Sequence, residues 1–582
     1  MYDVWYIRPM YVEVVPNRNS PPAILLREAW RQDGKTLKRT LANLSDWPEA
    51  KITSLRRLLR DEPLVAPDQL FEPLKTLPHG HVEAVLMTIG RLGLDSLLAS
   101  KSCRQRDLVV AMITQRLLQP CSKLAAVRDW TTTTLAEELS VQDANEEELY
   151  QAMDWLLERK ARIEKKLAGR HLTEGSLVLY DVSSSYYQGH HCPLAQFGHN
   201  RDGKKGTTSI VYGVLTDPRG CPLAVEVYPG NTADPTTVID QIDKLRDQFA
   251  LRKVILVGDR GMLTQPQIDQ LKSRVGFGWI TALTSAAINE LVDKADLQLS
   301  LLDEKNLAEI RSQQYPGERL MVCHNPLLKE QRARKRQELL EATEKQLRQI
   351  DKQVQRRTKT PLSAAQIGLK VGKVLGRYKM AKHLQVNIEE GKFTWSRRQE
   401  SIQQETQLDG IYVIRTSEPK ERLSAEQTVR SYKSLAQVER AFRSLKSIDL
   451  LVRPIRHRTE DRVTAHIFLC LLAYYVQWHM LQAWAPLLFA DENLPQQREL
   501  RDPILKPSDS PAVKQKKLTH RNADGLAVSS FSSLMKNLAS RVRLTMGLHD
   551  DSSSPTFQQV PLPSPLQQKA YQLLASFPVT GN

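Results

Sequence analysis

Cysteine is scarce in this chain of 582 residues, and none of its six cysteines belongs to a Cys-x-x-Cys pair. A scattered set of this kind favours reduced thiols over a disulfide framework. The N-terminal segment also lacks a basic stretch followed by an apolar one, so we expect no secretory signal peptide. Together these absences predict a cytoplasmic protein.

Long hydrophobic runs are absent as well. The most apolar segment, at 465–480, contains two histidines and a glutamine and is too short to cross a bilayer. The segment therefore predicts a buried core helix, and we expect no membrane partner.

Three kinds of catalytic site find no support in the sequence. There is no GxxxxGK[ST] phosphate loop and no Gly-x-Ser-x-Gly turn, which argues against ATP hydrolysis and against a nucleophile among the serines at 183–185. Zinc is not favoured either, because the histidines and cysteine at 190–199 have no second ligand pair with regular spacing.

Positive charge is the property that the chain has in excess. Its formal net charge is +16 and its pI is about 9.4, which predicts a polyanionic partner. Hydrophobic residues make up 41%, an ordinary value for a globular protein. The length implies about three or four structural units.

The N-terminal part divides into two regions. Residues 1–65 predict a small β-containing module with a hairpin turn at Asp33 and Gly34. Residues 66–175 have apolar residues at helical spacing and many basic residues, which predicts a helical region for DNA binding or dimerisation. A plain scaffold bundle is the alternative, because no helix-turn-helix pattern is recognisable.

The order of predicted elements changes at residue 176. Residues 176–284 predict three strands in a meander, followed by helices that alternate with two further strands. That order is typical of an RNase H-like mixed α/β sheet, and we assign it to the first part of a catalytic core. The second part, 409–480, begins with a strand and contains a basic helix. Residues 285–408 predict an insertion subdomain between the two parts, and 481–582 predict a C-terminal helix and tail.

Three acidic residues occupy positions suited to metal ions. Asp181 and Asp259 each follow a β-branched run, which places them at or near the ends of neighbouring central strands. Glu439 lies on the basic helix. Carboxylates from two strands and a helix suit a pair of Mg²⁺ ions, which activate an attacking oxygen and stabilise the leaving oxygen of an in-line displacement. We predict that these three residues are catalytic and bind the two ions, with Mn²⁺ as a substitute.

The helix of Glu439 also contains basic and aromatic side chains. Tyr432 and Lys446 lie two helical turns on either side of Glu439, and Arg443 follows it by one turn, so we expect one shared face. A salt-bridged surface helix is the alternative interpretation. The predicted DNA-binding residues are Tyr432, Arg443, Lys446, Arg453 and Arg456.

Several segments of the chain resemble the DDE transposases of bacterial insertion sequences, most closely the insertion sequence four superfamily. These segments are LVLYDVSSSYY, GHNRDGKKG, VYPGNTADPTT, VGDRGM, YKSLAQVERAFRSLKS and RPIRHRTEDRVTAHI, in one order. The resemblance covers about 176–480 well and 1–175 more weakly. It implies an RNase H-like core with an insertion before the last glutamate of a triad, which matches Asp181, Asp259 and Glu439.

The same resemblance includes a Tyr-Arg-Glu-Lys signature on the last helix. Tyr432, Glu439 and Lys446 match it, whereas Leu435 stands where an arginine is expected. In relatives the signature is tied to the handling of DNA strands, including hairpin intermediates. The leucine puts a hairpin route in doubt and leaves metal-dependent cleavage intact.

The function implied by this resemblance is DNA transposition. Such an enzyme binds the ends of its element, hydrolyses a phosphodiester at each end and joins the freed 3′-hydroxyls to target DNA. Double-stranded DNA would be its partner, a homodimer its working form, and the cytoplasm, at the nucleoid, its location. One alternative is an inactive, transposase-derived protein that binds a specific DNA sequence, and another is a structure-selective nuclease.

Overall fold

The computed structural model describes residues 10–18, 20–32, 34–62, 71–302, 305–447, 449–505, 508–548 and 555–578. The described residues form two compact units. The smaller unit comes from Met1–Leu77 and Val542–Pro561, and the larger comes from Pro78–Arg541 and Leu562–Asn582.

The larger unit is built on an eight-stranded mixed sheet with strand order β10-β11-β14-β9-β8-β5-β6-β7. β5, β6 and β7 form an antiparallel meander, whereas β8 pairs parallel with both β5 and β9. This is the RNase H-like order that the sequence predicts, and the α/β fold class is confirmed. The strands that form this core are β5 (Ser176–Tyr186), β6 (Ser209–Thr216), β7 (Pro222–Pro229), β8 (Val254–Val257) and β9 (Phe277–Ala282).

The central strands are apolar on both faces because helices cover both faces of the sheet. Side chains alternate along β5, so Leu179 packs into one hydrophobic cluster while Tyr180 and Val182 pack into another. The first cluster contains residues of α5, α8, α17 and α18, and the second contains residues of α9, α10 and α11. These helices are α5 (Arg104–Leu118), α8 (Glu146–Glu158), α9 (Lys160–His171), α10 (Thr237–Asp243), α11 (Gln265–Lys272), α17 (Leu435–Lys446) and α18 (Glu460–Ala483).

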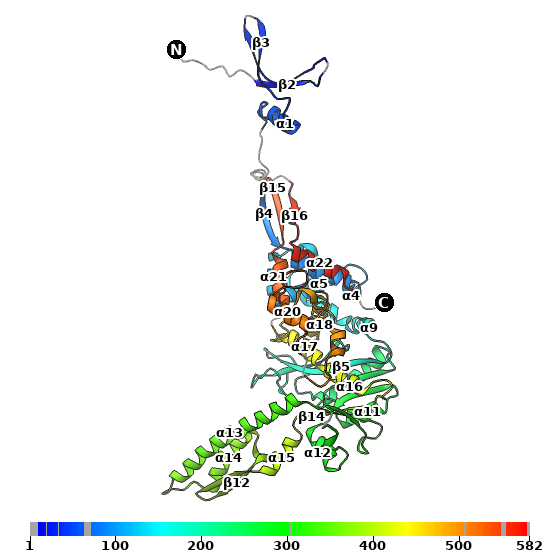
Figure 1. The fold of residues 1–582 in the computed structure, drawn as a ribbon, viewed down its shortest axis with the longest axis vertical. Coiled ribbons are helices and arrows are strands. Elements are labelled where there is room, and N and C mark those ends of the chain that lie inside the picture. The colour runs from blue at the N-terminus through cyan, green and yellow to red at the C-terminus, as the bar shows by residue number, and fades with distance from the viewer. Residues whose placement is uncertain are drawn as a thin grey trace. The chain divides into compact units, whose positions relative to one another are not determined.

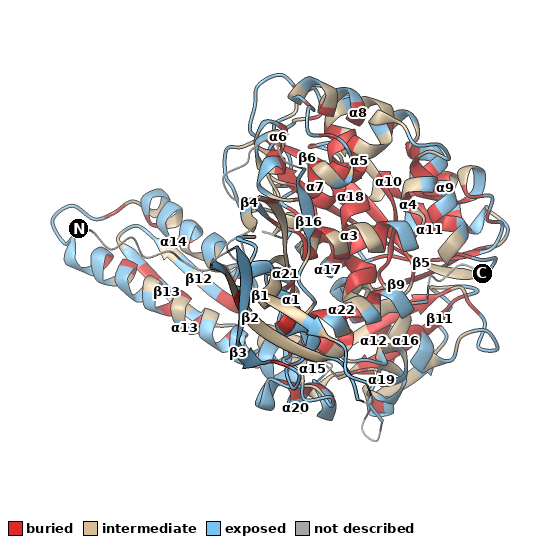
Figure 2. Ribbon diagram, turned by 90° about the horizontal axis from the view of Figure 1, so that it is seen from above, coloured by how far each residue is buried: buried red, intermediate tan, exposed pale blue. Residues whose placement is uncertain are grey.

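The helix α18 lies at the centre of the larger unit. It includes the apolar segment 465–480, whose residues are all buried, so the predicted core helix is confirmed (Figure 2). It contacts α5 and α8 on one side and β7 of the sheet on another. No helix among the described residues combines the length and apolarity needed to cross a membrane.

The predicted helical region before the core begins with a strand. β4 (Phe71–Pro78) precedes the helices and pairs with β15 (Val542–Leu548), which also pairs with β16 (Phe557–Gln559). The local sequence of β4 does not predict this strand, because the strands of its sheet come from the other end of the chain. The helices that follow, besides α5, α8 and α9, are α3 (Gly80–Arg91), α4 (Leu94–Leu98), α6 (Lys123–Asp129) and α7 (Leu135–Glu138).

The smaller unit also contains the predicted N-terminal hairpin. β2 (Ala23–Gln32) and β3 (Lys35–Asn43) pair antiparallel around Gly34, whose φ of 75° suits a glycine, while Asp33 lies outside the described residues. β1 (Met10–Val15) completes this sheet, and α1 (Glu49–Leu58) follows it.

The segment 285–408 divides between the sheet and a separate lobe. β10 (Leu307–Ile310) and β11 (Arg319–His324) extend the main sheet by pairing through β14 (Ile411–Thr416). The lobe, with α13, α14, β12 and α15, extends away from the sheet (Figure 1). It has its own small core, which includes Leu347, Ile367 and Phe393. Its elements are α13 (Pro326–Arg356), α14 (Ala364–Tyr378), β12 (Leu384–Glu389), β13 (Lys392–Arg397) and α15 (Gln399–Gln407).

The C-terminal segment is more structured than a helix and tail. The pattern near 530–546 predicts a single amphipathic helix, but the helix ends at Ala539 and β15 begins at Val542. The helices of this segment are α19 (Leu494–Leu500), α20 (Pro511–Thr519), α21 (Phe531–Ala539) and α22 (Pro565–Ser576).

The sequence Ser424-Ala-Glu-Gln427 predicts a capping box at the start of a helix, and the structure confirms it. The Ser424 hydroxyl accepts a hydrogen bond from the Gln427 amide at 3.2 Å, and the Gln427 side chain accepts one from the Ser424 amide at 2.9 Å. These bonds begin α16 (Ala425–Lys433), the helix before α17.

Replacing Ser424 with alanine is expected to destabilise the larger unit by about 1 kcal/mol, because one end of α16 loses its hydrogen-bond acceptor. Thermal melting measures the effect. The matched control is Ser532→Ala on the exposed surface of α21, which removes a serine that makes no cap. Equal shifts in the two variants would contradict the role assigned to Ser424.

Candidate active site

The sheet brings Asp181 and Asp259 to the same level on two neighbouring strands. Leu179 on β5 pairs with Val257 on β8, and each aspartate follows its strand partner by two residues. Because β5 and β8 run parallel, both side chains lie just beyond the carboxyl end of β8, where ligands bind in open α/β sheets, although β5 itself continues to Tyr186. Asp259 sits in a tight turn, where its Oδ1 accepts a hydrogen bond from the Met262 amide at 2.8 Å.

The helix α17 brings the third carboxylate to this level of the sheet. Its apolar face, which includes Val438, Phe442 and Leu445, is buried, and the helix packs against β5. Glu439 and Arg443 lie on its exposed side. All three predicted acids therefore line one cavity of about 650 Å³. The cavity is also lined by Ser183, His199, Arg201, Asp202, Asp234, Arg443, Lys446 and Arg453.

The three carboxylates act on one another electrostatically. The pKa of Asp181 is raised to about 7, first by burial and then by the negative charges of Asp259 and Glu439. The hydrogen bond from the Val182 amide and the charge of Arg201 oppose this rise. The site therefore concentrates negative charge that the protein leaves partly uncompensated.

A divalent cation fits this donor set. Carboxylate oxygens are the ligands preferred by Mg²⁺ and Mn²⁺, and a positive ion would relieve the repulsion that raises the pKa of Asp181. In the described residues, the carboxylates do not form a group whose ligand atoms all lie within 4.8 Å of one another.

This electrostatic arrangement predicts that the metal-free protein loses stability as pH rises. The pKa of Asp181 is about 7 in the folded protein against an ordinary 3.8, so the folded state binds this proton more tightly than the unfolded state. The free energy of unfolding therefore falls from about pH 4 to pH 7 and stays low above that. In EDTA at about pH 8, Asp181→Asn is expected to melt several degrees above wild type, with a gap that narrows towards pH 5. A gap that does not change with pH would contradict the raised pKa of Asp181 and the burial that is its first cause.

Tyr432 does not share a continuous helix with Glu439. The prediction of one helical face for Tyr432, Glu439 and Lys446 is wrong, because α16 ends at Lys433 and α17 begins at Leu435. The hydroxyl of the intervening Ser434 hydrogen-bonds to the Arg430 carbonyl at 3.0 Å, a contact that bends helices. Tyr432 nevertheless lies close to the acids. Its pKa is raised to about 12 by burial and by the charges of Asp259, Glu439 and Asp181.

Lys446 and Arg453 are held by an acid that the sequence analysis missed. Asp202, whose side chain is 1% exposed, accepts a hydrogen bond from Lys446 at 3.2 Å and forms an ion pair with Arg453. It also accepts one from the Tyr186 amide at 2.9 Å. Asp202 is the single carboxylate in the basic loop GHNRDGKKG, and the local sequence does not indicate its two distant partners. Both cations are therefore fixed in position beside the acids.

The remaining predicted DNA contacts lie in two places. Arg443 lines the acidic cavity, is exposed and has no hydrogen-bond or ion-pair partner among the described residues. Arg456 does not line this cavity; it donates to the Gln188 side chain at 3.1 Å and lines a second cavity.

Asp234 has a different role from the one its sequence suggests. The pattern Asp-Pro predicts a helix cap, but Asp234 lies inside the short 3-10 helix Asp234–Thr236 and its side chain pairs with Arg201. The pair lines the acidic cavity, so the cap interpretation is wrong. The distant partner, on the loop before β6, could not be seen in the local sequence.

A buried cluster of histidine and cysteine lies elsewhere in the fold. His171, Cys221 and His479 have possible metal-ligand atoms within 4.8 Å of one another. Among the described residues, this is the cluster of His, Cys, Asp or Glu side chains close enough to hold a metal ion. The Arg219 side chain lies 3.2 Å from His171 Nδ1, and a guanidinium only donates, so that nitrogen is an acceptor. The other nitrogen of His171 then carries the proton and faces the Tyr475 hydroxyl at 3.0 Å. This arrangement fits a hydrogen-bonded core better than a metal site.

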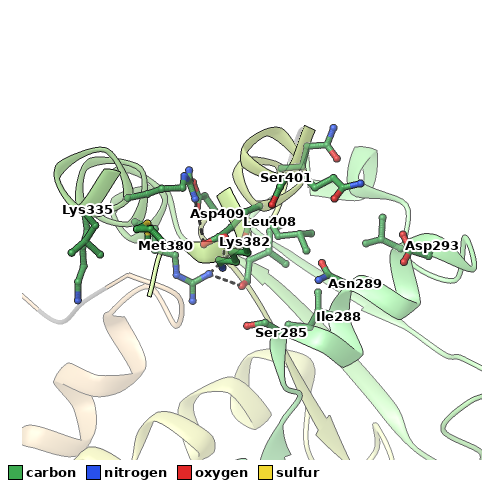
Figure 3. A pocket seen from close by; sticks show the side chains of 18 of the residues that line it. Ser285, Ile288, Asn289, Asp293, Lys335, Met380, Lys382, Ser401, Leu408 and Asp409 are labelled. Carbon is green, nitrogen blue, oxygen red and sulfur yellow. Dashed lines mark hydrogen bonds and ion pairs between the residues drawn. The ribbon is translucent and has the colours of Figure 1, made fainter. Parts of the chain in front are cut away.

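A further cavity of about 580 Å³ lies where the lobe joins the sheet (Figure 3). Side chains of α12 (Ser285–Asp293), α13 and α15 converge on it. Two ion pairs lie within it, Arg336 with Asp409 and Lys382 with Glu405. Its lining also contains Arg260, Arg332 and Lys335.

Comparison with known families agrees with this geometry. The family model described as a transposase DDE domain matches residues 173–476, just over half of the chain and the part that contains Asp181, Asp259 and Glu439. This chain belongs to the DDE transposases. The more specific insertion sequence four subtype stays a prediction.

Other comparisons add little to this assignment. No curated protein matches the DDE transposase described here. Among solved structures, a piggyBac transposase in a synaptic complex with hairpin DNA is similar at 9% sequence identity, over 78% of this chain and 86% of that chain. The TM-score of 0.33 is too low to establish correspondence between individual residues.

Proposed function

We propose that this protein binds the ends of an insertion sequence, hydrolyses a phosphodiester at each end and joins the 3′-hydroxyl ends to target DNA. The observation that supports the proposal best is the convergence of Asp181, Asp259 and Glu439 on one cavity beside an unpaired arginine. Acids alone would repel DNA, so the site suits DNA only with cations between the acids and the phosphate. Double-stranded DNA is accordingly the substrate, and two paired ends call for a homodimer.

The metal ions would be held by the three carboxylates. Mg²⁺, or Mn²⁺ in its place, supplies activation of the attacking oxygen and neutralises charge on the leaving oxygen. The protein's own part is to position the DNA strand. Arg443 is free to bind a phosphate, whereas Lys446 and Arg453 provide positive charge at positions fixed by Asp202.

Hydrolysis and joining require the same arrangement in succession. Each is an in-line displacement at phosphorus, first with water and then with the new 3′-hydroxyl as the attacking group. One set of carboxylates therefore serves both steps, and no covalent bond between protein and DNA forms.

The proposal is tested with labelled DNA that contains the element's own ends, a supercoiled target plasmid and Mg²⁺. We expect cleavage at the ends followed by joining to the plasmid. A substrate cut in advance and ending in a 3′-deoxynucleotide should bind without joining. Tight binding to the ends with no cleavage under any metal condition would instead favour the inactive DNA-binding protein.

A further inference from the structure

A second cavity of about 680 Å³ lies beside the acidic one, between the helical N-terminal region and the segment after α17. Six of its lining residues are basic, and no aspartate or glutamate lines it. Arg453 lines both cavities, so the two are neighbours. The basic residues are Arg116, Lys123, Arg453, Arg456, Arg458 and Arg462.

Lys123 is the most informative of these residues. It is 5% exposed, yet it has no hydrogen bond or ion pair among the described residues. Burial, and then the charge of Arg116, lowers the pKa of its amine to about 7. A buried amine without a partner is costly, and proteins normally provide an acid for it. A negative charge on a ligand would favour the protonated form of this amine, and no side chain in the cavity supplies one.

The walls around Lys123 are held in place by other contacts. Arg116 donates to the carbonyls of Leu450 and Leu451, each at 3.3 Å. Arg462 pairs with Asp154 at 3.2 Å and lies over the ring of Tyr150.

Two basic side chains of the cavity remain available to a ligand. Arg458 is exposed and has no partner among the described residues, and Arg456 contacts only an uncharged glutamine. The cavity therefore combines a buried amine with two exposed cations, a set of donors that suits an anion.

We propose that this basic cavity binds a backbone phosphate of the same DNA strand whose scissile phosphodiester lies in the acidic cavity. The inference rests on the proposed function. A phosphodiester suits it because arginine and lysine bind phosphate oxygens, and because the shared Arg453 puts the two binding places within reach of one strand. Lys123 contacts the phosphate at the base of the cavity, and Arg458 contacts it at the mouth. The N-terminal region thereby takes part in setting the cleavage position.

The test is a binding experiment without cleavage. End DNA is bound by the full-length protein in EDTA, and each phosphate near the cleavage position is replaced in turn by an uncharged methylphosphonate. In wild type, the replacement at one position is expected to weaken DNA binding about tenfold, which is the effect of losing one charged hydrogen bond. In Lys123→Met this position should become insensitive, because the partner of the phosphate is already gone. Lys536→Met, on the exposed side of α21, serves as the control and should retain the sensitivity.

A second variant and a second ligand make the result decisive. Arg458→Gln changes an exposed side chain and should reduce the sensitivity of the same position, even if Lys123→Met fails to fold. We call a phosphate position coupled if its replacement weakens binding in wild type but less so in a variant. If neither variant shows a coupled position, the inference is overturned. Thermal stabilisation of wild type, but not Lys123→Met, by inorganic phosphate without any coupled position would assign the cavity to free phosphate and also overturn it. If a coupled position is found but wild type does not cleave end DNA in Mg²⁺, this inference is supported and only the proposed catalysis is refuted.

Discussion

DNA cleavage by Glu439→Gln is expected to be slower than that by wild type by about three orders of magnitude, with binding to the element ends retained. The glutamine keeps the shape of the side chain and removes the charge that would hold a metal ion. Because Glu439 lies on the exposed side of α17, its replacement should not disturb the core. Single-turnover cleavage of labelled end DNA measures the rate, and a gel shift measures binding.

The control for this variant lies on the preceding helix. Glu426→Gln makes the same chemical change in α16, where Glu426 is exposed and forms only a 3.7 Å pair with Arg430. Exposed pairs of this kind contribute little, so cleavage should stay near the wild-type rate. Similar cleavage by both variants would show that Glu439 is not part of the reaction.

Asp202→Asn is expected to destabilise the larger unit by about 3 kcal/mol, because it removes the buried negative charge that two partly buried cations share. The side chain of Asp202 is 1% exposed, and both Lys446 and Arg453 pair with it. Thermal melting should show a loss of several degrees. Cleavage should also fall, since the two cations lose their fixed positions beside the acids.

An exposed ion pair provides the comparison for Asp202. Asp247→Asn removes a carboxylate that is 61% exposed and pairs with Arg246 at 2.6 Å. Its melting temperature should stay close to that of wild type. If Asp202→Asn melted no lower than Asp247→Asn, the buried acid would not be the support that we assign to it.

The core of the fold was accessible to sequence reasoning because its signals are local. Runs such as those of β5 and β8 are buried on both faces, so their apolar composition identifies each as a strand, and the order of elements then restricts the topology. The register of β5 and β8 explains why two aspartates separated by many residues reach one level of the sheet.

The parts that escaped prediction depend on partners far away in the chain. β4 pairs with β15 from the C-terminal segment, and β11 joins the main sheet through β14, beyond the lobe. Asp202 and Lys123 show the same limit for the site. Each lies in a basic or helical segment with no local sign of its role, and only the fold reveals that one has two cationic partners and the other has none.

The most direct test of the account is a count of the metal ions bound at the three carboxylates. Mn²⁺ is titrated into the protein bound to end DNA whose scissile phosphate is replaced by an uncleavable analogue, and electron paramagnetic resonance measures the bound ions. The account predicts two tightly bound Mn²⁺ ions in wild type and the loss of at least one in Asp259→Asn. Equal Mn²⁺ binding in wild type and in Asp259→Asn would contradict it.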